Sequence, residues 1–242
     1  MFSLLFASRA IEYTAGSGSS EPTPPSDDPV TPPTVDETYE GFNGSADKYI
    51  DKSNKVYYTY TNGGNTPSLA KDPENAANNV LNVQKAAQGE KAQIYAKISD
   101  TEKNANCYTF ETKLYFTKPT NTTAEFMRFT YMGSGTGIAN IGLATKYGEI
   151  GKVYLKYGSE YIEVAMENST WYDVKFELVD FGNGTGKVNI YIAKSGETLV
   201  SVAELDVASG VKSADTMRIL VDKNAHANSI YLDDMLLSGI AQ

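Results

Sequence analysis

Cysteine and histidine are almost absent from this 242-residue chain, which has one of each, Cys107 and His226. A single cysteine excludes an intrachain disulfide, a thiolate zinc cluster and a CxxC redox pair. A single histidine excludes any site that needs two imidazole groups. The sequence therefore argues against a disulfide scaffold and against the common zinc sites.

Runs of basic residues and long apolar runs are also missing. The chain has a net charge of -9 and no basic stripe, so it lacks the phosphate attraction that dominates nucleic-acid affinity. No apolar run approaches the length that spans a bilayer. We therefore predict neither nucleic-acid binding nor a membrane span.

The first 16 residues are apolar and are predicted to be an anchoring segment. The opening MFSLLFASRA is similar to a signal peptide, but no Lys or Arg precedes its apolar residues and that stretch is shorter than a usual h-region. We interpret it as a retained segment that docks on a carrier. An atypical cleaved signal is the alternative.

Residues 17–38 are predicted to be an acidic linker. They contain six of the nine prolines, together with Ser, Thr and acidic residues. Such a composition cannot bury enough apolar surface to offset its ordering entropy, so the segment is expected to be extended. Residues 39–242 then form one folded domain, which is within the size range of a single β-sandwich.

Alternation with a period of two dominates residues 39–242. In Tyr108–Phe116 and again in Trp171–Leu178, apolar and polar side chains alternate, which places them on opposite faces of a strand. Gly182–Gly186 supplies the backbone freedom of a hairpin turn before the strand 187–193. Further strands are expected at 55–61, 79–84, 91–99, 125–132, 138–144, 150–157, 160–166, 198–205, 216–222 and 231–235.

About a dozen short strands of this kind predict an all-β protein with two stacked antiparallel sheets, a jelly-roll sandwich. Only residues 68–80, SLAKDPENAANNV, have a composition that favours a helix, and Pro73 interrupts this segment. We expect one short helical turn there.

Several of these segments carry a resemblance to a known fold family. The Trp-led strand 171–181, the glycine turn, the strand 187–193 and the strand YLDDM at 231–235 resemble the concanavalin A-like lectin/glucanase superfamily, including laminin-G-like domains and bacterial or phage carbohydrate-binding modules. YEGFNG at 39–44 is similar to the first strand of such modules. The resemblance covers most of residues 39–242.

This resemblance implies glycan binding, sometimes glycan cleavage, and often a structural calcium. Glucanase members have a Glu-x-Asp-x-x-Glu pattern on one strand, which this chain lacks, and lyase members use Tyr with His, Arg or Gln, whereas only His226 is present as an imidazole. From the sequence we predict no enzyme activity.

Aromatic side chains on the face opposite the core are the predicted glycan-binding residues, because sugar C–H faces stack on indole and phenol rings. The alternative is that strands are simply rich in aromatic residues, some of which are exposed. The predicted ligand-binding residues are Trp171, Tyr154, Tyr191, Tyr115, Tyr58 and Tyr60.

Carboxylates supply two further hypotheses. Four of them on outward strand faces could form a hydrolytic pair; they are Glu111, Glu163, Asp173 and Glu177. We favour the alternative that they are solvated side chains balanced by Lys113 and Lys175 in cross-strand pairs. A calcium site is predicted at Glu40 and Asp234, since calcium prefers carboxylate and carbonyl oxygens. Turn chemistry for Asp and Asn is its alternative.

The order of anchor, spacer and sandwich predicts display on a larger assembly. The primary hypothesis is a non-catalytic structural and adhesion protein, a virion fibre or decoration subunit that binds glycan and forms a homo-oligomer. Its partner is a capsid or cell surface, and its location is the virion surface or the cell exterior. The alternatives are a carbohydrate-binding module of a secreted or cell-surface bacterial protein, and a glycoside hydrolase or polysaccharide lyase of the same fold.

Overall fold

The computed structural model describes residues 57–62, 68–83, 91–98, 105–117, 124–149, 151–221 and 230–240. These residues contain fourteen strands and no helix. The strands are β1 (Tyr57–Asn62), β2 (Ser68–Lys71), β3 (Asn79–Asn82), β4 (Lys91–Lys97), β5 (Cys107–Phe116), β6 (Ala124–Gly133), β7 (Thr136–Thr145), β8 (Lys152–Tyr157), β9 (Glu160–Glu167), β10 (Tyr172–Val179), β11 (Thr185–Lys194), β12 (Val200–Ala208), β13 (Thr216–Val221) and β14 (Ile230–Ile240).

The predicted anchor 1–16, the linker 17–38, Glu40 and His226 lie outside the described residues. Because the described part contains no helix, it has none that is long and apolar enough to cross a membrane.

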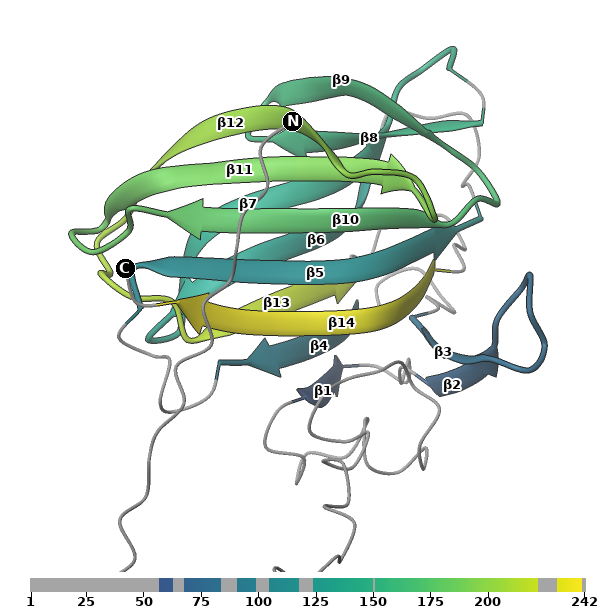
Figure 1. Ribbon diagram of the computed structural model, residues 1–242, viewed down its shortest axis with the longest axis horizontal. Helices are drawn as coiled ribbons and strands as arrows, with labels where there is room; N and C mark the ends of the chain where they lie inside the picture. Colours follow the sequence, from purple (N-terminus) through teal and green to yellow (C-terminus); the bar gives the residue numbers. More distant parts are fainter. Residues whose placement is uncertain are drawn as a thin grey trace, which may run out of the picture. The chain divides into compact units, whose positions relative to one another are not determined.

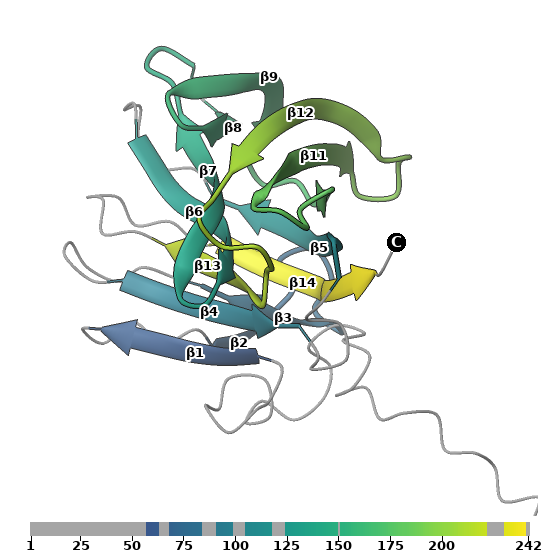
Figure 2. The same cartoon turned by 90° about the vertical axis from the view of Figure 1, so that its left-hand side faces the viewer.

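The strands form two antiparallel sheets of seven strands each. The front sheet, which faces the viewer in Figure 1, has the order β12-β11-β10-β5-β14-β3-β2. The back sheet has the order β1-β4-β13-β6-β7-β8-β9, and its strands lie on the left-hand side of Figure 2. The prediction of an all-β, two-sheet jelly-roll sandwich is confirmed.

The core between the sheets follows from the predicted alternation. Along β10 the side chains at even positions from Tyr172 to Leu178 are buried, whereas those at odd positions between them are only partly buried. Phe176 stacks on Phe110 of β5 in the same sheet, with 6.3 Å between ring centroids, and packs on Phe129 of β6 across the core at 5.1 Å. The hydroxyl of Tyr131 also lies in this layer, where it donates a hydrogen bond to the carbonyl of Phe176 at 2.7 Å.

The turn between β10 and β11 lies where the glycine-rich sequence predicted it. β10 pairs with β11 in an unbroken register from Tyr172–Lys194 to Val179–Lys187. Gly184 has a φ of +80°, and a Cβ atom there would lie 2.5 Å from the carbonyl oxygen of Ser209. Only glycine meets both conditions without strain.

The expected helical turn in residues 68–80 is wrong. The segment forms β2 and β3, which pair with each other, and turns and bends connect them around Pro73. β3 also pairs with β14 through Leu81 and Asn82, so a long-range backbone ladder outweighs the weak local preference for a helix.

Candidate functional site

An open groove of about 370 Å³ lies on the outer face of the front sheet. Its floor is formed where β5 and β10 run side by side, because the alternation of each strand that buries its apolar residues turns its polar ones outward. One wall is the connection between β11 and β12, and the other is β14. The lining residues are Glu111, Thr112, Lys113, Asp173, Val174, Glu197, Leu199 and Asp234.

The charges of the groove are only partly compensated. Four of its side chains are carboxylates and one is an ammonium, that of Lys113. Lys113 forms an ion pair with Asp234 at 2.5 Å, and this hydrogen bond raises the pKa of the lysine. Glu111 is 3.7 Å from Lys175 on the neighbouring strand. Acceptor oxygens therefore dominate the groove.

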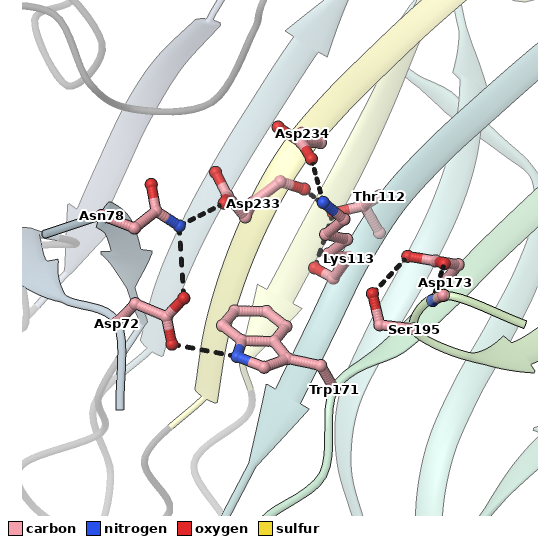
Figure 3. Close-up of polar contacts among 10 residues, drawn as sticks. Asp72, Asn78, Thr112, Lys113, Trp171, Asp173, Ser195, Asp233 and Asp234 are labelled. Carbon is pink, nitrogen blue, oxygen red and sulfur yellow. Dashed lines mark hydrogen bonds and ion pairs between the residues drawn. The ribbon is translucent and has the colours of Figure 1, made fainter. Parts of the chain in front are cut away.

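Asp173 on the floor of the groove is hydrogen-bonded to the connection between β11 and β12, which forms one wall (Figure 3). Its carboxylate accepts hydrogen bonds from the hydroxyl of Ser195 at 3.1 Å and from the backbone N–H of Gly196 at 3.4 Å. Both donors belong to the turn that follows β11. The position of Glu197 and Leu199 is thus linked to a floor residue.

An exposed apolar side chain borders the polar groove. Leu236 pairs with Glu111 across β14 and β5 and is 42% exposed. Large hydrophobic residues with such exposure are rare in the described part of the chain, where Val200 and Tyr147 are the others. The groove therefore offers polar and apolar contacts side by side, as ligand sites usually do.

A polar network fixes the end of the sheet beside the groove (Figure 3). The indole N–H of Trp171 donates to Asp72 at 3.0 Å, and the amide of Asn78 donates both to Asp72 at 3.2 Å and to Asp233 at 2.9 Å. Burial alone would raise the pKa of Asp72, but the hydrogen bonds from Glu74 N–H, Trp171 and Asn78 outweigh it and lower that pKa. The network holds the β2–β3 connection on the sheet.

The aromatic residues that were predicted to bind a ligand do not form one exposed platform. Trp171 and Tyr115 lie on the predicted outer face, but they are only 8% and 7% exposed because they pack with Val80 and Tyr231 in a small second cluster. The alternation of the sequence places Trp171 and Tyr115 on the outer face of the front sheet. It cannot show that the segment around β3 covers these two side chains.

The other predicted aromatic residues are distributed over both sheets. Tyr191 of β11 donates its hydroxyl to Glu177 at 2.8 Å, and this hydrogen bond raises the pKa of the tyrosine. Tyr154 is on β8 of the back sheet, where a hydrogen bond to Glu149 raises its pKa to about 12. Tyr58 and Tyr60 are on β1, at the edge of the same sheet, opposite Tyr95 and Gln93 of β4.

The four predicted carboxylates do not all meet. Glu111 and Asp173 line the groove, and Glu177 lies further along β10, but Glu163 is on β9 of the back sheet. The expected balancing by lysines is present for Glu111 and Glu177, which both pair with Lys175. The sequence did not point to the groove residues Glu197 and Leu199, which lie in the connection between β11 and β12.

The calcium site stays a prediction. The described residues contain no group of three or more His, Cys, Asp or Glu side chains that could hold a metal ion, and Glu40 lies outside them. Asp234 already has the ammonium of Lys113 as its cationic partner. Its neighbour Asp233 points to Asn78 instead, so the two successive carboxylates do not converge.

Asp233 is the most deeply buried carboxylate near the groove, at 5% exposed, and its Oδ1 has no hydrogen-bond partner among the described residues. Burial raises its pKa, so the folded protein binds this proton more tightly than the unfolded chain. The stability contributed by this group is therefore lost as pH rises from its ordinary value of 3.8 through the folded value.

We expect Asp233→Asn to stabilise the protein at pH 7 by about 1 kcal/mol, because a neutral amide replaces a buried charge and still accepts from Asn78. The gain should disappear at pH values below 3.8, where the wild-type side chain is also neutral. Urea unfolding at both pH values measures it. Asp234→Asn, which loses an exposed ion pair, is the control and should cost at most about 1 kcal/mol. Equal destabilisation by Asp233→Asn at both pH values would contradict the assignment.

Solved structures share this architecture. The catalytic domain of a glycoside hydrolase family 131 protein from Coprinopsis cinerea superposes with a TM-score of 0.55 at 12% identity, covering 83% of this chain and 94% of that one. A carbohydrate esterase from the Shiga toxin-encoding bacteriophage phi24B gives 0.51 at 13% identity over 78% and 91% of the two chains. A cellulose-induced protein gives 0.52 at 9% identity over 82% and 99%. No protein-family model and no curated protein sequence matches the chain.

These likenesses concern the fold alone, a two-sheet jelly-roll sandwich. They correct one prediction. The sequence predicted that the protein is not an enzyme, but a glycoside hydrolase domain and a carbohydrate esterase have this architecture, so the fold admits catalysis. The absence of a Glu-x-Asp-x-x-Glu pattern on one strand is therefore no ground for excluding catalysis, because carboxylates from different strands lie on one face of the sheet.

Proposed function

We propose that this domain binds a carbohydrate in the groove on the front sheet. The observation that carries the proposal is the gathering of four carboxylates around one open site, with the exposed side chain of Leu236 beside Glu111. Sugars present hydroxyl donors at their edges and C–H groups on their faces. Carboxylates accept hydrogen bonds from such hydroxyls, and these charge-assisted bonds are stronger than neutral ones.

Binding is tested by calorimetric titration of the full chain with the oligosaccharides that a glycan array selects. Asp173→Asn and Glu111→Gln each remove a charged acceptor and should weaken binding by about tenfold or more. Glu204→Gln on β12 is the matched control, because it removes one carboxylate that pairs with Lys187 away from the groove. Unchanged affinity in both groove variants, with melting temperatures close to wild type, would refute the site.

Glycoside hydrolysis in the same groove is a second candidate function. Lys113 is directly opposite Asp173, and Glu111 is opposite Lys175, so Glu111 and Asp173 occupy diagonal positions on adjacent strands. Diagonal neighbours on adjacent strands are about 7–8 Å apart, so their carboxyl groups can reach the separation of about 6.5–9.5 Å that inverting glycosidases use. Reducing-end assays on the bound oligosaccharides test this reaction. Release by wild type that Asp173→Asn and Glu111→Gln abolish supports hydrolysis, and no release at any pH contradicts it.

The proposal includes display on a carrier, a virion or a cell surface, through residues 1–16 with residues 17–38 as the spacer. The composition of these segments supports it, and a bacteriophage protein is among the similar folds. Deletion of residues 1–16 should abolish incorporation into the carrier and leave the melting temperature of the sandwich unchanged. Normal incorporation of the truncated protein would show that this role is wrong. Sequencing the mature N-terminus separates virion display from secretion through a cleaved signal.

A further inference from the structure

The four carboxylates that line the groove are not neutralised to the same extent. Asp234 and Glu111 lie 2.5 Å and 3.7 Å from the ammonium groups of lysines. Asp173 and Glu197 form no ion pair with any lysine or arginine in the part of the chain that the structure describes. Asp173 is on β10 and Glu197 is in the connection between β11 and β12, whereas the paired carboxylates are on β5 and β14. One side of the groove therefore carries negative charge that no ion pair balances.

The lysine that is nearest to Glu197 in the sequence is directed elsewhere. Lys194 ends β11, and its carbonyl oxygen accepts a hydrogen bond from the N–H of Glu197 at 2.9 Å, which closes the turn. The ammonium of Lys194 is paired with Glu167 at 3.2 Å. The turn thus presents Glu197 as an exposed carboxylate at the groove, while the neighbouring positive charge is bound to another acid.

Asp173 is hydrogen-bonded, but its charge is not cancelled (Figure 3). Its two carboxylate oxygens accept from the hydroxyl of Ser195 at 3.1 Å and from the N–H of Gly196 at 3.4 Å, and both donors are uncharged. Lys113 is directly opposite Asp173 on β5, but its ammonium is paired with Asp234. A carboxylate accepts about four hydrogen bonds, so Asp173 keeps acceptor capacity for a ligand.

We propose that the groove selects a saccharide with a positive charge, an amino sugar whose amine is free. An ammonium group has three N–H donors and no acceptor, so it matches two carboxylates that lie near each other. Asp173 and Glu197 supply this pair, because Gly196, which donates to Asp173, directly precedes Glu197. Leu199 lines the same side of the groove and offers apolar contact to the C–H groups of the ring.

The charge of the groove also disfavours one class of saccharide. Four carboxylates against a single ammonium make the groove negative, and a cleft of one sign concentrates ligands of the opposite sign. A polymer of uronic acids is repelled for the same reason. This inference rests on the function proposed for the groove and specifies the charge of the ligand.

The test is a calorimetric titration of the full chain at mildly acidic pH with a tetramer of glucosamine, whose amines are then charged, and with its N-acetylated form, which has the same rings without the charge. We expect the free amine to bind at least about tenfold more tightly, because hydrogen bonds between charged partners are the stronger ones. This preference should decrease as sodium chloride increases. A tetramer of galacturonate should bind more weakly than either.

The double variant Asp173→Asn/Glu197→Gln removes both unpaired charges and keeps an acceptor oxygen at each position. It should reduce the preference for the free amine to about twofold or less. Glu197→Gln alone removes one exposed charge and should reduce the preference about threefold, the scale of an exposed ion pair. Glu160→Gln on β9 of the back sheet is the matched control, since it also removes an exposed carboxylate and lies away from the groove.

The outcomes separate this inference from carbohydrate binding as such. If none of the three tetramers binds, both proposals fail together. If the N-acetylated tetramer or the galacturonate tetramer binds as tightly as the free amine, the amino-sugar inference alone is wrong. It is also wrong if the full preference persists in the double variant or, should that protein not fold, in Glu197→Gln. An equal loss of preference in Glu160→Gln, or displacement of the sugar by an equal concentration of tetralysine, would show a response to charge alone and would overturn it as well.

Discussion

Replacing Trp171 with alanine should lower the free energy of unfolding by about 3–5 kcal/mol, the usual cost of removing a buried Trp or Phe side chain. The indole is 8% exposed and packs on Tyr115 with 5.3 Å between ring centroids. It also donates the hydrogen bond that holds Asp72 on the sheet. The variant therefore loses both the small aromatic cluster and the attachment of the β2–β3 connection.

Trp171→Phe separates these two contributions. It keeps most of the apolar contact and loses the donor, so it should cost about 1–3 kcal/mol. Urea unfolding measures both variants, and limited proteolysis within residues 72–78 reports the release of the connection. The network would not hold the β2–β3 connection on the sheet if neither variant became sensitive to protease within residues 72–78. A smaller loss of unfolding free energy in the alanine variant than in the phenylalanine variant would contradict the assignment as well.

Tyr131→Ala is expected to have a similarly large effect, about 3–5 kcal/mol, because the ring is fully buried between the two sheets. Its hydroxyl donates to the carbonyl oxygen of Phe176 at 2.7 Å and lies 3.2 Å from the carbonyl oxygen of Tyr108. These hydrogen bonds connect β6 of the back sheet to the front sheet. Burial raises the pKa of Tyr131 well above its ordinary value, so the hydroxyl remains a donor at all physiological pH values.

Tyr131→Phe is the matched variant. It retains the ring and removes the donor, and we expect a loss of about 1 kcal/mol. Thermal and urea unfolding of both proteins give the two numbers. A phenylalanine variant as unstable as the alanine variant would mean that the hydrogen bond, and not packing, is the main contribution of this residue.

Much of the fold could be predicted because it is encoded locally. The alternation in β5 and β10 and the glycines after β10 specify a face and a turn within a few residues. β2 was missed because four residues carry too little periodicity, and its partner β3 is held by β14, which is about 150 residues away in the sequence. Pairing over such a distance leaves no local signal.

The groove was only partly predictable. Outward faces for Glu111 and Asp173 follow from alternation. Asp234 reaches Lys113 because the register of β14 against β5 shifts between Asp233 and Leu236, with Asp234 at a φ of 46°. A bulge of this kind changes which residues share a face, and period-two reasoning cannot anticipate it. The burial of Trp171 and Tyr115 likewise depends on contacts with residues that are distant in the sequence, Val80 and Tyr231.

The strand order has a consequence for how the chain folds. β13 lies between β4 and β6, and β14 lies between β3 and β5, so both sheets are completed only by the last two described strands. A nascent chain on the ribosome therefore exposes the unpaired edges of β5 and β6 until residues 216–240 have been synthesised. Such late, distant pairings slow folding and leave edges open to aggregation. Refolding should accordingly be slow and sensitive to protein concentration.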